Sequence, residues 1–356
     1  MDSKQAKKAS VVELLERLEE GLVSDEELKK LVHVQLEKRL QWGYKPTHQE
    51  QLAFHLDFIK SLKQMDIAGD MEMMNSESYE LPISFLKTMF GKTLKQSACY
   101  FESESVTIDE AEIAMNALHC ERARLKDGQR ILDIGCGQGS LIFHIANKYK
   151  NCLLTGITNS CTQKTYIEEQ CKNLKLSNIK VILADVTKYE TEDKFDRIVI
   201  IEALEHMKNI ELFLKRTSKW MKEDGLLFVD HVCHKVFPDK FEELDEEDWY
   251  SEYIFPKGSV IVNAASTLLY FQDDVSVIDH WIINGKNMAR SHEEWMKNLV
   301  KNVDVAKDIL KVAMGSEEAA ERCIIHCRNF HLSMSELFSY QNGEEWMVSH
   351  VLFKKR

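Results

Sequence analysis

The sequence predicts an α/β protein with a parallel β-sheet that is covered by helices on both faces. Three observations lead to this prediction. From about residue 129 to residue 235, apolar runs that suit buried strands alternate with amphipathic helical segments. The first of these strands runs into a glycine-rich loop at residues 131–140. Helical periodicity precedes the alternating region and returns near residue 291, which predicts an N-terminal helical extension and a C-terminal cap.

The N-terminal part of the chain predicts a helical region. Apolar residues recur there at a spacing near 3.6, as Val12, Leu15 and Leu18 do. Three helices are expected, at about residues 10–22, 25–41 and 47–66. We interpret residues 1–100 as one unit, whose later part forms a lid over a ligand site.

Residues 101–235 are expected to form the sheet and its covering helices. The predicted strands are RILDIG, NCLLTGIT, NIKVILADV, FDRIVIIEAL and GLLFVDHVC, and the predicted helices are SLIFHIANKY, CTQKTYIEEQCKNL and ELFLKRTSKWM. Strands that are joined by short links through helices lie parallel, and the helices cover both faces of such a sheet. Ligands of an open parallel sheet bind at the carboxyl ends of its strands.

Beyond this region the alternation weakens. An acidic stretch at residues 242–248 precedes a segment rich in aromatic and branched residues, and two helices are predicted near residues 291–313 and 316–332. We interpret residues 236–340 as a cap that binds substrate, and residues 341–356 as a closing strand of the sheet. The acidic stretch suits either a solvated loop or a lid over a cation.

The composition is that of a globular protein with an acidic surface. Of the 356 residues, 44% are hydrophobic, and the formal net charge is -12 at pH 7. Nucleic acids and anionic membranes favour basic surfaces, so neither is expected as a partner, whereas a cationic substrate is. No apolar run reaches the roughly 18 residues of a membrane span, and the polar N-terminus lacks the apolar core of a signal peptide. Nine cysteines without a regular framework therefore predict reduced thiols in the cytoplasm, and a homodimer is compatible with the sequence.

The loop ILDIGCGQGS is the clearest ligand-binding motif. Its glycines permit a tight turn and a close approach of a ligand to the backbone, and their spacing alone leaves a dinucleotide site open. Asp133 precedes the loop, where it would repel a pyrophosphate, and Ser140 stands in place of the third dinucleotide glycine. The second strand ends in Thr158 and Asn159 and has no acidic residue there to hold a ribose. Asp133 better suits a cationic ligand, such as the ammonium and sulfonium groups of S-adenosyl-L-methionine.

These motifs carry a family resemblance. LDIGCGQG is similar to the first motif of class I S-adenosylmethionine-dependent methyltransferases, which have a Rossmann-like sheet, and ITNSCTQ, LADV and FDRIVIIEALEHM follow it in order. KQSACYF, EHM and YIFP narrow the resemblance to the cyclopropane-fatty-acid-synthase-like group. Nearly the whole chain resembles the plant benzylisoquinoline alkaloid N-methyltransferases, and DHWIINGKNMARS looks closest to their tetrahydroprotoberberine branch.

The resemblance implies methylation of a tertiary amine in a tetrahydroprotoberberine alkaloid, of the stylopine or canadine type, to a quaternary product. The coclaurine and pavine substrate classes are the first alternative. A lipid-modifying methyltransferase or cyclopropane synthase is a more distant one, and a non-catalytic S-adenosylmethionine-binding scaffold is a third.

The resemblance also implies a set of residues that contact the cofactor, namely Ser97, Gly135, Gly137, Asn159, Gln163, Asp185, Val186 and Ile201. Ser97 would hold the carboxylate end, and the two glycines and Ile201 would lie along the methionine part. Asn159 and Gln163 would sit near the ribose. Asp185 and the amide of Val186 would bind the adenine edge.

The strand FDRIVII ends in Glu202, and Glu205 and His206 follow closely. These groups can form a solvated helix start, where acidic residues favour the helix dipole. In the implied fold they instead border the transferred methyl group. A protonated amine has no lone pair, so a base must take its proton, and the unperturbed pKa of a histidine, about 6.5, suits that role. We expect His206 to be the base and Glu205 and Glu202 to anchor the amine.

A flat polycyclic cation favours aromatic faces. The aromatic candidates are Tyr79, Tyr100, Phe255, Phe330 and Phe338, although each of them also suits plain core packing. By the resemblance, Phe255 and Phe330 are preferred, and Cys327 replaces a tryptophan of the coclaurine-type relatives, which leaves a roomier pocket. His331 stands at the active-site cysteine of the lipid cyclopropane synthases, and Asp230 at their bicarbonate-binding histidine. Both changes argue against lipid cyclopropanation.

Two further segments, DHVCHK and CIIHC, contain residue types that bind metals. Zinc sites usually pair such a segment with a distant partner. We expect no metal site from either one.

Overall fold

The computed structural model describes residues 3–68, 80–255 and 260–356. Within these residues one sheet has the strand order β3-β2-β1-β4-β5-β8-β7, and the short β6 pairs with β5. The strands are β1 (Arg130–Ile134), β2 (Leu153–Thr158), β3 (Ile179–Leu183), β4 (Phe195–Ile201), β5 (Met221–His234), β6 (Asn263–Ala264), β7 (Val275–Ile283) and β8 (Trp346–Lys355). The five strands from β3 to β5 are parallel, as predicted.

The sheet differs from the prediction at one edge, where β8 and β7 run antiparallel to their neighbours. The closing strand β8 was expected, but β7 was read only as a segment rich in branched residues. A very short link from the last helix to β8 returns the chain along β5 in the opposite direction, and antiparallel neighbours need no crossover helix. The direction of the strands at this edge is therefore set by the short link before β8 and not by the alternation of strands and helices.

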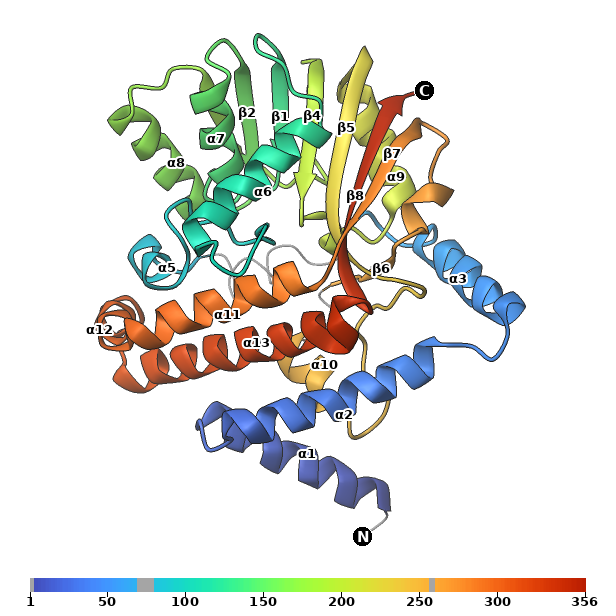
Figure 1. The fold of residues 1–356 in the computed structure, drawn as a ribbon, viewed down its shortest axis with the longest axis vertical. Coiled ribbons are helices and arrows are strands. Elements are labelled where there is room, and N and C mark those ends of the chain that lie inside the picture. Colours follow the sequence, from blue (N-terminus) through green and yellow to red (C-terminus); the bar gives the residue numbers. More distant parts are fainter. Residues whose placement is uncertain (1–2, 69–79, 256–259) are drawn as a thin grey trace.

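Helices cover both faces of the sheet (Figure 1). One face carries α6 (Ile108–Arg122), α7 (Ser140–Lys148) and α8 (Cys161–Asn173), and the other carries α3 (His48–Leu62) and α9 (Ile210–Trp220). Each of these helices contributes buried apolar residues to the cluster on its own side of the sheet. The α/β class predicted from the sequence is confirmed.

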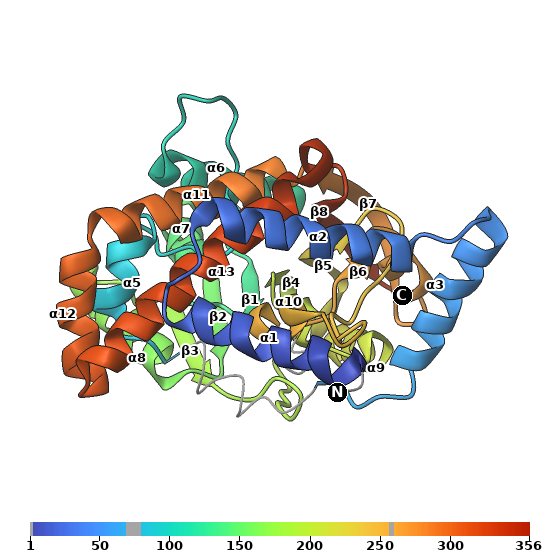
Figure 2. The same cartoon turned by 90° about the horizontal axis from the view of Figure 1, so that it is seen from below.

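A separate helical layer lies beyond the carboxyl ends of the parallel strands (Figure 1). It contains α1 (Ser3–Glu19), α2 (Asp25–Gly43), α5 (Ile83–Met89), α10 (Trp249–Ile254), α11 (Lys286–Lys301), α12 (Val303–Met314) and α13 (Glu317–Gly343). Figure 2 shows α1 and α2 from below, and both of them contact α13. The three N-terminal helices were predicted, whereas α5, α6 and α10 were not. Across the described ranges, no helix combines the length and apolarity that crossing a bilayer requires.

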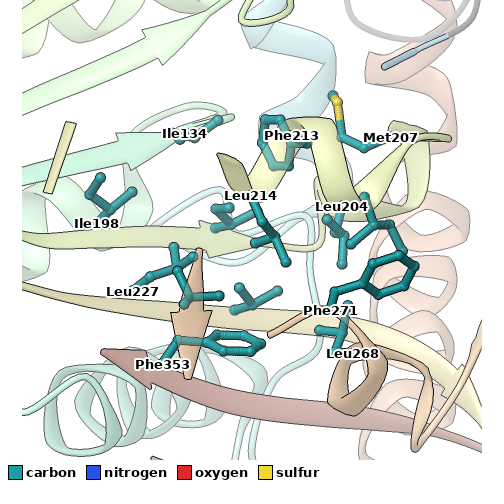
Figure 3. Close-up of a cluster of buried hydrophobic side chains, with 14 of the residues drawn as sticks. Ile134, Ile198, Leu204, Met207, Phe213, Leu214, Leu227, Leu268, Phe271 and Phe353 are labelled. Carbon is teal, nitrogen blue, oxygen red and sulfur yellow. The ribbon is translucent and has the colours of Figure 1, made fainter. Parts of the chain in front are cut away.

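The core between the sheet and α9 also anchors the segment that follows β4 (Figure 3). Ile198 and Leu227, on neighbouring strands, belong to the same buried cluster as Phe213 of α9. Leu204 and Met207 join this cluster from the 3₁₀ turn η1 (Leu204–His206) and its end. Because these two apolar side chains are buried, the turn that carries two of the acid–base candidates is held firmly against the sheet.

A buried ion cluster fastens α2 to the segment of residues 237–251. Arg39 is 1% exposed, and its guanidinium lies 2.5 Å from Asp239 and 2.8 Å from Asp248. Arg39 also donates to the hydroxyl of Ser251 and stacks over the ring of Phe241. Arg39 also donates to the carbonyl of Glu242, so both ends of the acidic stretch expected at residues 242–248 are tied to α2.

Replacing Arg39 with Met should leave two buried carboxylates without their counter-ion. Removing one partner of a buried ion pair costs about 3–5 kcal/mol of unfolding free energy. Urea denaturation followed by circular dichroism measures this loss. Lys38→Met is the matched control, because Lys38 only reaches Asp245 and Glu247 at 3.4 Å on the surface, where a pair contributes less than about 1 kcal/mol. Equal stability of the two variants would contradict the clamping role of Arg39.

Candidate active site

A pocket opens at the carboxyl ends of β1, β2 and β4, the edge of the sheet that faces the helical layer (Figure 1). Among the residues predicted from the sequence, those that line it are Ser97, Gly135, Gly137, Asn159, Gln163, Val186, Ile201, Glu202 and His206. The fold thus brings all but one of the expected cofactor residues and two of the three expected acid–base residues to one cavity, and Asp185 and Glu205 do not line it. Their individual roles stay predictions.

The glycine loop forms the floor of this pocket. Gly135 and Gly137 have positive φ angles of 77° and 52°, which other residues rarely adopt. A Cβ atom on Gly135 would lie 2.7 Å from the Cβ of Ala203, whereas one on Gly137 would meet no atom of the described chain within 4 Å. The amides of Gly135 and Cys136 both donate to the carbonyl of Ile157, which ties the loop to β2. The loop is therefore closely packed on one side and open to a ligand on the other.

Asp133 lies at the base of the loop and is 3% exposed. Burial raises the pKa of its carboxyl to about 7, while the charge of Lys95 acts in the opposite direction. A carboxyl in this state ionises readily when a cation is placed beside it. The position therefore suits a ligand with a positive charge, as the sequence analysis inferred.

The far end of the pocket is built by β2, α8 and the segment after β3. The hydroxyl of Thr158 donates to the side-chain carbonyl of Gln163 at 2.6 Å, which orients that amide. Val186 lines the pocket, but Asp185 does not. One oxygen of Asp185 accepts hydrogen bonds from the amide and the hydroxyl of Thr187. The expected contact between Asp185 and adenine is thus left as a prediction.

Glu202 stands where β4 ends, in a strained backbone conformation with φ of 45°. Its amide donates to the carbonyl of Asp230 on β5 at 2.9 Å. Its carboxyl oxygen Oε1 accepts the amide of Ala98 at 2.7 Å. These two contacts place the Glu202 side chain in the wall of the pocket, between the sheet and the segment that carries Ser97.

Glu205 follows on the 3₁₀ turn and is only 6% exposed. Its Oε1 accepts the amide of Val232 at 2.7 Å, and its Oε2 has no hydrogen-bond partner in the described part of the chain. Glu205 is therefore not part of a solvated helix start, which was the alternative interpretation of this segment. His206, the next residue, lines the pocket beside Glu202.

The surroundings of Glu202 and Glu205 favour the neutral forms of both carboxyl groups. Burial raises the pKa of Glu205 to about 8, against the hydrogen bond from Val232. Burial and the nearby charge of Asp230 raise the pKa of Glu202 well above its ordinary value. Lys95 is the one lysine or arginine among the described residues that line the pocket, and its charge acts against both effects on Glu202. A cationic ligand in the pocket would therefore favour the ionised forms of these carboxyl groups.

Sequence reasoning missed several polar residues of the pocket. Lys95 is 4% exposed and donates to the hydroxyl of Ser97. Asn116 donates to Ser140 at 2.9 Å, and both of them line the same end of the pocket. Of these, only Lys95 was signalled by the sequence, because it stands two residues before Ser97 in KQSACYF.

The aromatic candidates lie in the helical layer. Tyr100, Phe255 and Phe330 belong to one apolar cluster, in which Phe255 packs edge-on against Phe241 with ring centroids 4.5 Å apart. Phe338 is 2% exposed and part of the same core. Tyr79 lies outside the described residues, so its expected role cannot be placed.

The last two substrate candidates occupy positions on α13. Cys327 packs with α5 and α12 in a separate apolar cluster. His331 is 5% exposed, with its Nδ1 2.8 Å from Nδ1 of His292 and its Nε2 3.1 Å from the sulfur of Met89. Burial lowers the pKa of His331 to about 3, so the ring is neutral. Substrate contacts by these two residues stay predictions.

Comparisons with known proteins identify the family of this chain. Residues 69–322 match the mycolic acid cyclopropane synthetase family. An (S)-tetrahydroprotoberberine N-methyltransferase of Eschscholzia californica is 57% identical over 98% of this chain and 99% of its own length. A pavine N-methyltransferase of Thalictrum flavum subsp. glaucum is 52% identical over 100% of both chains.

Comparison with solved structures identifies the same family. A coclaurine N-methyltransferase bound to N-methylheliamine and SAH has a TM-score of 0.96 and 53% identity, covering 97% of this chain and 100% of that one. A cyclopropane synthase from Mycobacterium tuberculosis shares the fold, with a TM-score of 0.67 and 21% identity over 82% of this chain and 100% of its own. The chain therefore belongs to the mycolic acid cyclopropane synthetase family and, within it, to the plant N-methyltransferases of the tetrahydroprotoberberine, pavine and coclaurine type, as predicted.

Proposed function

We propose that this chain is an S-adenosyl-L-methionine-dependent N-methyltransferase that converts the tertiary amine of a tetrahydroprotoberberine alkaloid to a quaternary N-methyl product. The observation that carries this proposal is the arrangement of Glu202 and His206 in the lining of a glycine-loop pocket, with the buried carboxyl of Glu205 next to them on the same turn. The identity of 57% with a tetrahydroprotoberberine N-methyltransferase supports the choice of substrate.

The pocket residues fit the proposed cofactor. Lys95 and Ser97 offer an ammonium and a hydroxyl to its carboxylate, and Asp133 offers a carboxylate to its positive charges. The open side of Gly137 lets the ligand approach the backbone. When bound, S-adenosyl-L-methionine supplies an electrophilic methyl group and leaves as S-adenosyl-L-homocysteine, which is the compound that the related coclaurine enzyme holds.

The residues at the end of β4 would prepare the amine. Near neutral pH a tertiary alkaloid amine carries a proton, which must leave before its nitrogen can attack. We assign the removal of that proton to His206, with Glu205 and Glu202 anchoring the ammonium and stabilising the positive charge that grows on nitrogen. The quaternary product has no proton to lose, so the base acts only before the transfer. Holding nitrogen and methyl in line contributes further to the rate.

The other substrate classes receive less support. The pavine and coclaurine relatives are 52% and 54% identical to this chain, which keeps them as the alternative. A cyclopropane-fatty-acyl-phospholipid synthase of Escherichia coli is only 28% identical over 64% of the chain. The net charge of -12 also disfavours an anionic lipid surface and nucleic acid as partners.

The proposal also covers the cellular compartment and the oligomeric state of the enzyme. All nine cysteines are free, which supports a reducing compartment, the cytoplasm. A homodimer stays compatible with the chain.

Incubation of the purified protein with methyl-labelled S-adenosyl-L-methionine and a panel of acceptors tests the proposed reaction. The panel holds a tertiary-amine tetrahydroprotoberberine, a secondary-amine benzylisoquinoline, a pavine and an unsaturated phospholipid. We expect most label in the quaternary tetrahydroprotoberberine, identified by mass spectrometry. Preferential labelling of the secondary amine would move the substrate to the coclaurine class. Labelling of none of them, with the cofactor bound, would refute the alkaloid reaction.

Replacing Glu205 with Gln should remove a carboxyl that ionises near pH 8 while the hydrogen bond from Val232 is kept. A raised pKa means that the group is neutral at lower pH and anionic above it, so wild-type kcat/KM should rise with pH up to about 8. The variant should lose this rise, and its kcat should fall by roughly 10²–10⁴-fold. Glu211→Gln is the control. It alters a half-buried carboxylate on α9 that is paired with Lys63, and it should keep the wild-type pH profile. An unchanged profile in Glu205→Gln would exclude the proposed role of Glu205.

A further inference from the structure

Asp230 lies behind the candidate active site and has no assigned role there. It is 0% exposed, on β5, and it is not one of the residues that line the pocket. Its register partner on β4 is Ile201, and its carbonyl accepts the amide of Glu202. The buried carboxyl of Asp230 is therefore attached, through one backbone hydrogen bond, to the residue that forms the pocket wall.

Two histidines contact the Asp230 carboxyl, one from an earlier and one from a later part of the chain. Nε2 of His119, on α6, lies 2.7 Å from Oδ2 of Asp230, and Nε2 of His350, on β8, lies 3.1 Å from the same oxygen. Both rings are fully buried. Oδ1 of Asp230 has no hydrogen-bond partner within the described residues. The three groups join one helix to two neighbouring strands.

Arg122 settles which nitrogen of His350 carries the hydrogen. Its guanidinium lies 2.7 Å from Nδ1 of His350 and can only donate, so Nδ1 accepts and Nε2 bears the hydrogen that faces Asp230. The spacing of His119, Asp230 and His350 would also admit a metal ion. This tautomer leaves His350 no free nitrogen for a metal, so the arrangement is that of a carboxylate that is hydrogen-bonded to His119 and lies in close electrostatic contact with His350, whose Nε2 makes no hydrogen bond within the described residues.

The charge state of the cluster follows from these contacts. Burial lowers the pKa of His119 to about 3, so its ring is neutral, and the ionised Asp230 accepts its Nε2 hydrogen. Although burial alone would oppose ionisation, His350 and His119 hold the pKa of Asp230 well below its usual range. The cluster therefore carries one fixed negative charge, which the guanidinium of Arg122 partly offsets from its outer end.

We propose that Asp230 is a positioning residue that acts through Glu202, as a permanent buried anion that keeps the Glu202 carboxyl neutral until cationic ligands fill the pocket. Burial raises the pKa of Glu202 most, and the charge of Asp230 adds to this effect, so that loss of the anion would let the charge of Lys95 favour the ionised form of Glu202 more strongly. With the anion in place, the negative charge of Glu202 develops only when the cofactor and the amine arrive. This inference rests on the proposed N-methyltransferase activity.

Other charged groups face Glu202 as well. Lys95 approaches it from the segment before α6, and Glu205 from the 3₁₀ turn. The amide of Ala98 donates to it, and His206 lines the same pocket. Lys95 and the amide favour the ionised form of Glu202, whereas Glu205 and Asp230 oppose it. Asp230 contributes the stronger of these two opposing charges, and it differs from Glu205 because its own charge is locked by the two histidines.

The pH dependence of affinity for the quaternary N-methyl product tests this inference, because that ligand has no proton of its own on nitrogen. Wild-type affinity should rise with pH as the pocket carboxyls ionise. In Asp230→Asn, which keeps the size and an acceptor oxygen but removes the charge, the rise should move to lower pH by on the order of one unit. Asp230→Glu restores the charge and should return the rise to the wild-type position.

Arg122→Gln provides a second variant in case Asp230→Asn does not fold. Removing the positive charge that offsets Asp230 should move the rise in the opposite direction, to higher pH. A purely structural cluster predicts weaker binding in these variants with no displacement along the pH axis, and that result would overturn the inference. Stoichiometric metal in the wild-type protein that is lost in Asp230→Asn would overturn it too. A wild-type protein that neither binds nor forms the quaternary product would refute the proposed function instead.

Discussion

The burial of carboxyl groups around the carboxyl end of β4 is the constraint on which the rest of the site depends. Glu202 directly follows β4, and its amide donates to the carbonyl of Asp230, which lies within the neighbouring strand β5. An ionised carboxylate without a partner is costly in such an environment, so each group must be neutral, paired, or matched by a ligand cation. Asp230 is paired with two histidines, whereas Glu202 and Glu205 are left for the ligand.

The fold holds this costly arrangement by packing around it. Leu204 and Met207 bury the turn that carries Glu205 in the core beneath the sheet. The amides of Ala98 and Val232 bind Glu202 and Glu205 from two different parts of the chain. The positive φ of Glu202 is maintained by the same contacts. Strain and burial therefore concentrate where the proposed reaction needs prearranged charge.

Much of this arrangement was predictable because it is encoded locally. Alternating apolar runs predicted the parallel strands, and the glycine loop with Asp133 predicted a pocket for a cationic ligand. Residues that become neighbours only in the folded chain were not predictable in this way. Asn116 reaches the pocket from a helix without a local ligand-binding pattern, and His119 and His350 contact Asp230 from more than a hundred residues away. The antiparallel β7 was missed because its alternation of apolar residues is weak.

The central claim is that the pocket carboxyls are neutral when the site is empty and ionise when a cation binds. Titration calorimetry with a quaternary N-methyl tetrahydroprotoberberine that lacks free phenols tests it directly, since any proton released must come from the protein. At pH 7, in two buffers of different ionisation enthalpy, we predict that the heat depends on the buffer and corresponds to net proton release, because burial raises the pKa of Asp133, which lines the pocket, to about 7 and that of the nearby Glu205 to about 8. Binding heats that do not depend on the buffer would contradict the account.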